Sequence, residues 1–131
     1  MKLQYVDAWI AKRRRLADRY NALLSDLPVT RPIEKEYAKH AYWVYTIRLS
    51  SKAARTCVQE HLSGKGIGTH VFYPICVPDQ KPFRSTQNHD DPFEVSRAAA
   101  DRMLALPFFE SLSEHEQDYV VECLEEALEI C

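Results

Sequence analysis

Hydrophobic residues follow two different periods along the chain, and each period predicts one kind of element. In four segments apolar residues recur every three or four positions, which places them on one face of a helix. These segments predict helices at about residues 3–26, 52–63, 92–104 and 113–131. Three shorter segments are dense in β-branched and aromatic residues, and they predict strands at residues 41–49, 68–73 and 104–108.

The predicted elements give an α+β fold, in which a small, mostly antiparallel sheet of about three strands carries about four helices on one face. Alternation along the first strand assigns its side chains to two faces. The predicted core face carries Ala41, Trp43, Tyr45, Ile47 and Leu49, and the opposite face carries Tyr42, Val44, Thr46 and Arg48. Because Pro107 lacks a backbone donor, we expect residues 104–108 to form an edge strand.

Capping residues support the helix boundaries. Ser50 or Ser51 can cap the second helix, and Ser113 with Glu116 forms a capping box before the last one. The first helix is long enough to overhang a small core, as a connector from a preceding domain would. Since Met1 already lies inside its pattern, we expect part of the protein to be missing upstream.

All three glycines of the chain, Gly64, Gly66 and Gly68, fall between the second helix and the second strand. Gly64 is placed to end the helix, and the other two allow a tight turn into the strand. They precede a strand instead of opening a helix, so they are not a dinucleotide-binding fingerprint. Pro74 ends the strand and leaves Tyr73 at its end, where side chains commonly face a cleft. Residues 75–91 predict an irregular surface loop.

Composition restricts the class of protein. The chain has 131 residues, of which 46% are hydrophobic and 27% charged, as expected for one ordinary globular domain. A formal net charge of −2 gives no reason to expect a nucleic-acid partner, and the run Arg13-Arg14-Arg15 is most simply a solvated face. No secretory signal or membrane-spanning run is visible, so we expect a cytoplasmic protein without a membrane partner.

The four cysteines carry no pattern that predicts a metal site or a disulfide framework. No C-x-x-C pair occurs, and no histidine lies at zinc-site spacing from a cysteine. Cys57 and Cys123 fall on apolar helical stripes and are expected to be buried thiols. Cys76 follows the central strand and could line a cleft, although no base that would activate it is recognisable. We therefore assign no catalytic residue and no metal ligand.

Five blocks of sequence, taken in order, go further than these patterns. They are residues 17–23, 40–48, 66–74, 104–109 and 112–120. Together they resemble the carboxy-terminal domain of the DegT/DnrJ/EryC1/StrS aminotransferases, and the resemblance spans nearly the whole chain. These enzymes use pyridoxal phosphate, have the aspartate-aminotransferase fold type, and aminate keto groups on nucleotide-linked sugars.

The resemblance implies that residues 1–131 are a single domain, the small C-terminal domain of a larger enzyme. Family members carry the Schiff-base lysine and most cofactor contacts in an amino-terminal domain that this chain lacks. We therefore expect no cofactor on the chain alone and no turnover by it. Pyridoxal phosphate, a nucleotide-sugar substrate and a homodimeric assembly belong to the complete enzyme, whose active-site cleft this domain helps to close.

By resemblance, Thr69, Phe72 and Tyr73 line the substrate side of the cleft between the two domains, with Gln80 nearby. The family often has His-Tyr-Pro where this chain has Phe72-Tyr73-Pro74. If that histidine contacts the sugar in relatives, Phe72 offers only a stacking or apolar surface, and the substrate contact here differs or is lost. In the alternative, Phe72 and Tyr73 simply pack against the missing domain. A second class of function also stays open, a free-standing regulatory module derived from this domain, although neither a helix-turn-helix pattern nor a basic surface is evident.

Overall fold

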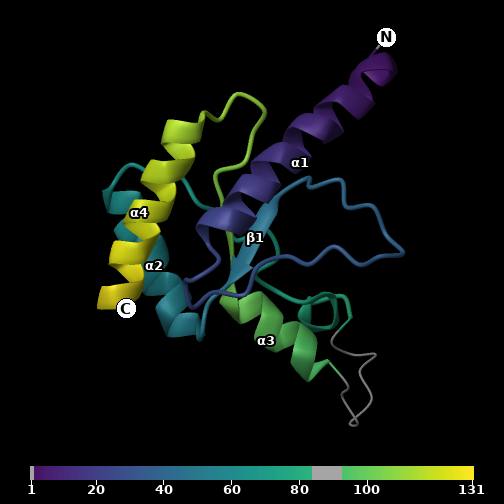
Figure 1. Ribbon diagram of the computed structural model, residues 1–131. Helices are drawn as coiled ribbons and strands as arrows, with labels where there is room; N and C mark the ends of the chain where they lie inside the picture. Colours follow the sequence, from purple (N-terminus) through teal and green to yellow (C-terminus); the bar gives the residue numbers. More distant parts are fainter. Residues whose placement is uncertain (1, 84–92) are drawn as a thin grey trace.

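The computed structural model describes residues 2–83 and 93–131 and has the predicted α+β class (Figure 1). Its helices are α1 (Val6–Leu23), α2 (Lys52–Gly64), α3 (Glu94–Arg102) and α4 (Glu114–Ile130), with short 3-10 turns η1 (Lys2–Tyr5) and η2 (Val77–Asp79). The strands are β1 (Tyr45–Arg48) and β2 (Met103–Leu106). Pro92, which marks the expected start of the third helix, and residues 84–91 of the expected loop lie outside the described residues.

The sheet has two strands, so the predicted third strand at residues 68–73 is wrong. β1 and β2 pair antiparallel, with Tyr45 opposite Leu106 and Ile47 opposite Leu104. From the segment 68–73 only His70 joins the sheet, through an isolated bridge to Ala105. Pro74 cannot donate to a ladder, and the two residues before it, Phe72 and Tyr73, are exposed.

The predicted edge strand at residues 104–108 is confirmed as β2, one of the two strands of the sheet, but Pro107 is not the reason for its position. Ala105 pairs with Thr46 of β1 on one side, and on the other it exchanges two backbone hydrogen bonds with His70, of 2.8 and 3.1 Å. Pro107 follows the end of β2, so its missing donor interrupts nothing. β2 therefore lies between β1 and the His70 bridge.

At the start of the predicted first strand, Tyr42 and Trp43 lie on the opposite faces to those predicted. Tyr45, Ile47 and Leu49 are buried as expected, but Tyr42 is only 4% exposed and Trp43 is 59% exposed. Tyr42 has a positive φ of 46°, a conformation outside the β region, so the alternation of side chains does not continue through it. The strand consequently begins at Tyr45 and not near residue 41.

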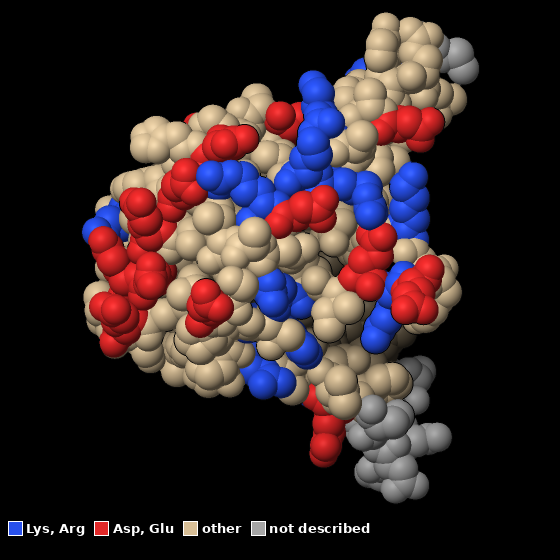
Figure 2. All heavy atoms as spheres, in the orientation of Figure 1, with Lys and Arg blue, Asp and Glu red and all other residues tan. Residues whose placement is uncertain are grey.

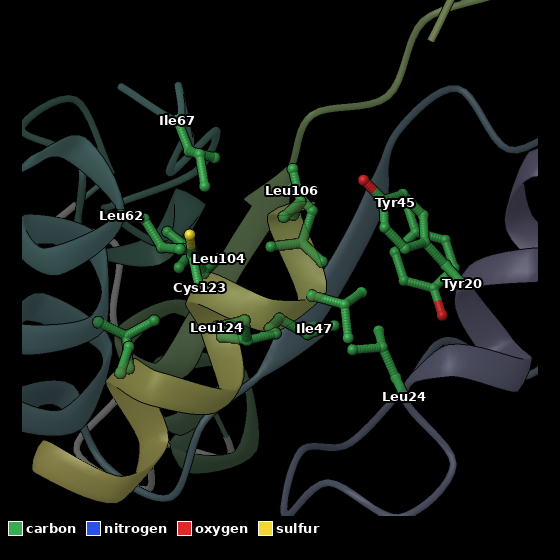
Figure 3. Close-up of a cluster of buried hydrophobic side chains, with 14 of the residues drawn as sticks. Tyr20, Leu24, Tyr45, Ile47, Leu62, Ile67, Leu104, Leu106, Cys123 and Leu124 are labelled. Carbon is green, nitrogen blue, oxygen red and sulfur yellow. The ribbon is translucent and has the colours of Figure 1, made fainter. Parts of the chain in front are cut away.

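The hydrophobic core lies between one face of the sheet and helices α1, α2 and α4 (Figure 3). The sheet contributes Tyr45, Ile47, Leu104 and Leu106, and the helices contribute Tyr20, Leu62, Leu124 and their neighbours. One polar side chain, Gln117, is fully buried among them, and its Nε2 donates to the Leu16 carbonyl at 3.1 Å. The opposite face of the sheet carries Thr46, Arg48, Met103 and Ala105, and no helix of the described residues covers it.

Helix ends follow the predicted caps with one shift. Ser51 caps α2, and Ser113 and Glu116 form the expected capping box of α4. The glycine that closes α2 is Gly66, with φ of 77°, and not Gly64, which is the last helical residue. Its N–H bonds the Ser63 carbonyl and the Ile67 N–H bonds the Leu62 carbonyl, the pattern of a Schellman cap.

α1 ends at Leu23, three residues earlier than predicted, and its buried residues, Ala17 and Tyr20, lie in its second half. Figure 1 shows the first half projecting away from the body of the domain, as expected for a helix that overhangs its core.

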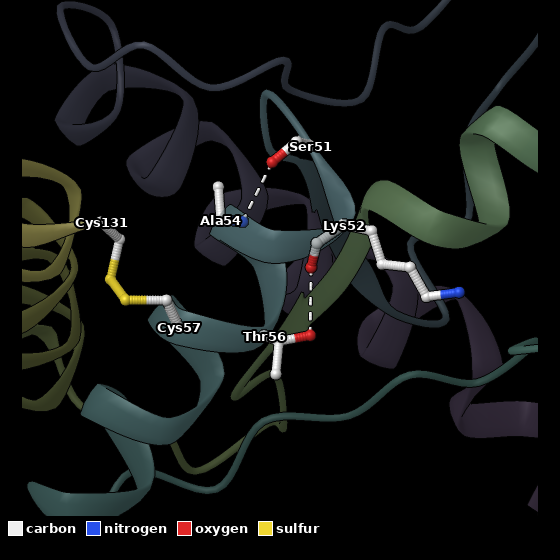
Figure 4. The surroundings of a disulfide bond; sticks show 6 residues. All are labelled: Ser51, Lys52, Ala54, Thr56, Cys57 and Cys131. Atoms are coloured by element: carbon white, nitrogen blue, oxygen red, sulfur yellow. Dashed lines mark hydrogen bonds between the residues drawn. A yellow bond between two sulfur atoms is a disulfide. The ribbon is translucent and has the colours of Figure 1, made fainter.

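The expectation that no disulfide is present is wrong. Cys57 of α2 is bonded to Cys131, directly after α4, with a Cα–Cα distance of 5.8 Å (Figure 4). The two residues are 74 positions apart, and the packing of α2 on α4 brings them together, which spacing in the sequence cannot reveal. Cys76 and Cys123 are free, and Cys123 is buried as expected.

Candidate functional site

The open face of the sheet forms an apolar pocket of about 140 Å³. Its floor comes from the outward side chains of the two strands, Thr46, Met103 and Ala105. Its walls come from the two segments beside the sheet, and comprise Trp43, Val44, His70, Val71, Phe72 and Tyr73. Two stretches of chain that are about 30 residues apart in sequence therefore meet in one site.

Aromatic rings dominate the rim of this pocket. The ring centroids of Trp43 and Phe72 are 5.1 Å apart, and those of His70 and Phe72 are 4.6 Å apart, both within the range of aromatic pairs. Phe72 is 40% exposed and Tyr73 is 68% exposed, so the rings pack on each other while still facing outward. Among the described residues no Lys, Arg, Asp or Glu lines the pocket.

A polar cluster behind the pocket holds Trp43 in this position. The Tyr42 N–H donates to His40 Nδ1 at 2.9 Å, and the two rings lie 4.1 Å apart. Arg14 donates to both Glu34 and the His40 carbonyl. These contacts fix Tyr42 in its positive-φ conformation and turn the next residue, Trp43, outward.

Glu34 has a perturbed acidity because of this cluster. Hydrogen bonds from the Arg14 guanidinium, and then from the His40 N–H, lower the pKa of Glu34 to about 2. The same contact raises the pKa of Arg14. The pair is therefore ionised throughout the neutral range, and the tether between α1 and the loop before β1 is charge-assisted.

The structure brings together two of the four residues expected at the substrate side. Phe72 and Tyr73 line the pocket, whereas Thr69 is half-buried outside it and Gln80 is exposed beside η2. Two further residues of the pocket were not expected there: Trp43, which alternation places in the core, and His70. A kink at Tyr42 leaves no signal in a hydrophobic pattern, so only the structure could identify Trp43.

A second, more polar hollow contains Cys76. It is lined by Ile75, Cys76 and the ion pair of Arg97 with Asp79, in which two N–O distances are 2.8 Å. Of the described residues that line this hollow, Asp79 and Asp101 carry carboxylates and none is a histidine. Within residues 2–83 and 93–131 no group of three His, Cys, Asp or Glu side chains is arranged to hold a metal ion.

The lysines of the chain are distributed over its surface. Each of the seven lysines is exposed, and none lines the apolar pocket. A cofactor bound as a Schiff base needs a lysine held in a shielded site, together with groups that bind its phosphate.

In the parts of the chain that the structure covers, no helix is long and apolar enough to cross a membrane.

The chain matches the model of the DegT/DnrJ/EryC1/StrS aminotransferase family over residues 1–125. It is 35% identical over 130 residues to a pleiotropic regulatory protein of Geobacillus stearothermophilus, covering 96% of this chain and 34% of that protein. It is 30% identical over 125 residues to the erythromycin biosynthesis sensory transduction protein EryC1 of Saccharopolyspora erythraea, covering 95% and 33% respectively. The chain thus spans about a third of the length of the curated relatives it matches.

Solved structures agree with the sequence match. A DegT DnrJ EryC1 StrS aminotransferase from Brucella abortus superposes with a TM-score of 0.84 at 26% identity, covering 95% of this chain and 32% of that one. NtdA from Bacillus subtilis, determined with its bound cofactor PMP, superposes with a TM-score of 0.81 at 27% identity, covering 93% and 29%. By its sequence and its fold, this chain belongs to the DegT/DnrJ/EryC1/StrS family of aminotransferases, which depend on pyridoxal phosphate.

Proposed function

We propose that this chain is the small C-terminal domain of an aminotransferase that transfers an amino group to a keto sugar carried on a nucleotide. The observation that carries this proposal is the family match over residues 1–125, which covers nearly the whole chain but only about a third of each relative. In this proposal residues 1–131 are one domain of a longer, cytoplasmic polypeptide. The remainder of that polypeptide supplies the cofactor site, and two such polypeptides form a dimer.

The names of the relatives support the substrate class. They include a dTDP-3-amino-3,4,6-trideoxy-α-D-glucose transaminase from Micromonospora megalomicea and a GDP-perosamine synthase from Escherichia coli O157:H7. The nucleotide and the sugar differ between these enzymes, but in both names a nucleotide carries an amino sugar. We therefore propose a nucleotide-linked keto sugar as substrate, with neither a nucleic-acid nor a membrane partner.

The open face of the sheet is the part of this chain that would border the active-site cleft. Phe72 and Tyr73 are exposed there beside an apolar pocket, and we propose that they face the substrate together with Thr69 and, more distantly, Gln80. Pyridoxal phosphate accepts and donates the amino group in this family, and no described residue of this chain is proposed to hold it. The contribution of the chain is to shape the cleft and to exclude water from it.

The reading frame upstream of Met1 provides the first test. An in-frame domain that contains the family's lysine is expected, and the complete polypeptide should transfer nitrogen to a UDP-, GDP- or dTDP-linked keto sugar. The assay follows consumption of the pyridoxamine form by absorbance. A complete polypeptide that binds the cofactor and aminates none of these substrates would overturn the proposed substrate class.

The isolated chain provides the second test. After incubation with pyridoxal phosphate and borohydride, peptide mapping should find only scattered, substoichiometric labelling of the exposed lysines. A single stoichiometric and saturable adduct would show that the chain has a cofactor site of its own, and the domain assignment would then be wrong.

A free-standing regulatory module is the second candidate, because a 35% identical relative is named a pleiotropic regulatory protein. Figure 2 shows basic and acidic side chains interleaved on one face of the molecule, instead of a single basic patch. A nucleic-acid-binding surface normally carries a surplus of positive charge in one patch, and the face in Figure 2 does not show one. An upstream stop codon with an independent promoter would favour this candidate over the aminotransferase domain.

A further inference from the structure

We propose, building on the aminotransferase function above, that Trp43 and Phe72 form a stacking platform for the base of the nucleotide that carries the sugar. The two rings meet at the rim of the apolar pocket, with 5.1 Å between their centroids and an angle of 51° between their planes, so a flat base stacks on one ring and contacts the other with its edge. Trp43 is 59% exposed and Phe72 is 40% exposed, so both retain ring surface that a flat ligand can cover.

Contacts made by neighbouring residues position both rings of the platform. Trp43 follows Tyr42, whose buried ring packs against His40 and lies 6.0 Å from the Arg14 guanidinium carbon. Phe72 lies two residues after His70, which is fixed to Ala105 by two backbone hydrogen bonds, and the His70 ring also packs on Phe72. A rigid aromatic surface loses little conformational entropy when a ligand covers it.

The lining of the pocket indicates which part of a nucleotide sugar it accepts. The described lining offers no Lys or Arg to pair with a phosphate group, so the pocket suits a neutral part of the ligand. A hexose would leave hydroxyl groups without partners, since among the described residues only Thr46, His70, Tyr73 and the Trp43 indole N–H offer polar groups to the pocket. A base instead presents two apolar ring faces and can keep its polar edge toward solvent at the open side.

Stacking on aromatic rings tolerates different bases, because every base has a π-face. The site therefore accepts uracil, thymine and guanine alike, and it does not by itself select the nucleotide. The same surface could instead serve only as an apolar contact with another domain or with a second copy of the chain, and the experiment below includes that outcome.

The test uses Trp43 as its own reporter. Trp9 is the other tryptophan of the chain and lies on the projecting half of α1, in contact with Tyr5, so Trp9→Phe leaves Trp43 as the single fluorophore. Titration of this variant with uridine, thymidine and guanosine, excited at the red edge of tryptophan absorption, should give saturable quenching. Methyl glucoside and inorganic phosphate should give none at the same concentrations.

A pair of phenylalanine variants in the same background separates stacking from general effects. Phe72→Ala should raise the dissociation constant for the nucleosides about tenfold, in line with the usual contribution of one stacking ring. Phe109→Ala is the matched control, since Phe109 is 48% exposed but lines a different groove beside Gly66, and its dissociation constant should equal that of the parent. Circular dichroism confirms that both variants are folded.

The inference is overturned by absence of saturable quenching, by equal quenching with methyl glucoside, or by an unchanged dissociation constant in Phe72→Ala. If Phe72→Ala reduces self-association while nucleosides have no effect, the surface is an apolar contact only. In the complete polypeptide, an unchanged KM in Trp43→Ala with normal turnover would overturn the platform and leave the proposed function intact. If the chain binds nucleosides but the complete polypeptide transfers no amino group, the proposed function is overturned and the aromatic platform is not.

Discussion

At the scale of single residues, Tyr42 determines which side chain borders the pocket. A non-glycine residue with positive φ is uncommon, and it persists only where its surroundings hold it. Here the Tyr42 N–H bonds His40, and Arg14 links His40 to Glu34. The exposure of Trp43 is therefore a consequence of contacts made by its neighbours, and not of its own hydrophobicity.

The Arg14–Glu34 pair should make this cluster sensitive to acid. Since the pKa of Glu34 is lowered from 4.5 to about 2 in the folded chain, its stabilising effect is present above pH 4.5 and is lost as pH falls from 4.5 toward 2. We expect Glu34→Gln to melt at a lower temperature than the parent at neutral pH, with the difference shrinking in that acid window. The exposed Glu110→Gln is the control, and an equal difference at all pH values would contradict the assignment.

Gly66 should resist replacement because of its backbone conformation. It has a φ of 77°, and a Cβ built on it would meet no atom within 4 Å, so the cost of alanine is conformational and not steric. We expect Gly66→Ala to lower the free energy of unfolding by about 1 kcal/mol. Gly68→Ala is the matched control, since Gly68 has equal space and no positive φ. Chemical denaturation measures the free energy of unfolding of both variants. Equal values for Gly66→Ala and Gly68→Ala would contradict the prediction that a side chain at position 66 strains the Schellman cap.

At the scale of elements, several cross-links join α4 to α2 and the residue that follows α2. The Cys57–Cys131 disulfide lies at one end, and Glu126 of α4 pairs with Lys65 at 2.7 Å and lies 3.5 Å from His61. Tyr119 also donates to the Lys65 carbonyl at 3.2 Å. Between these polar contacts the two helices share buried apolar residues, so the interface does not depend on the disulfide alone.

Removal of the disulfide should destabilise the domain without unfolding it. The bond joins residues 74 positions apart, and a cross-link of that span usually stabilises by about 2–4 kcal/mol, because it restricts the unfolded chain. We expect Cys57→Ser, or a reducing agent, to lower the melting temperature, whereas Cys76→Ser should not. Thiol titration of the denatured, unreduced parent should detect the two free cysteines, Cys76 and Cys123. Four reactive thiols would mean that the bond is absent.

At the scale of the whole molecule, the helices cover one face of the sheet and leave the other open. The open side carries Trp43, Phe72 and Tyr73, and further exposed apolar residues, Ile75 and Val77, follow in the chain. Contiguous apolar surface of this kind usually marks a contact site. Tyr42, which the sequence places on this surface, is instead buried.

The isolated chain should therefore self-associate through this face. Sedimentation at several concentrations is expected to show a monomer in equilibrium with larger species. The double variant Trp43→Ser, Phe72→Ser should shift that equilibrium toward monomer, while Phe109→Ser, which changes a different exposed aromatic, should not. A strictly monomeric parent that binds no apolar dye would contradict the open-face assignment.

The sequence by itself determined the elements whose causes are local. Apolar spacing predicts all four helices, and Ser51 and the Ser113–Glu116 box place two of their starts, because a helix is stabilised by groups within a few residues of each other. The burial of Tyr45, Ile47 and Leu49 follows from alternation in the same way. The α+β class and the family resemblance rest on this local information.

Tertiary structure decided the features that depend on residues far apart in sequence. Whether residues 68–73 form a strand depends on which edge of β2 they meet, and only His70 meets it. The Cys57–Cys131 bond depends on the packing of α2 on α4. The pocket depends on a kink at Tyr42 that Arg14, 28 positions earlier, helps to hold. Such contacts carry no period in the sequence, so a hydrophobic pattern cannot record them.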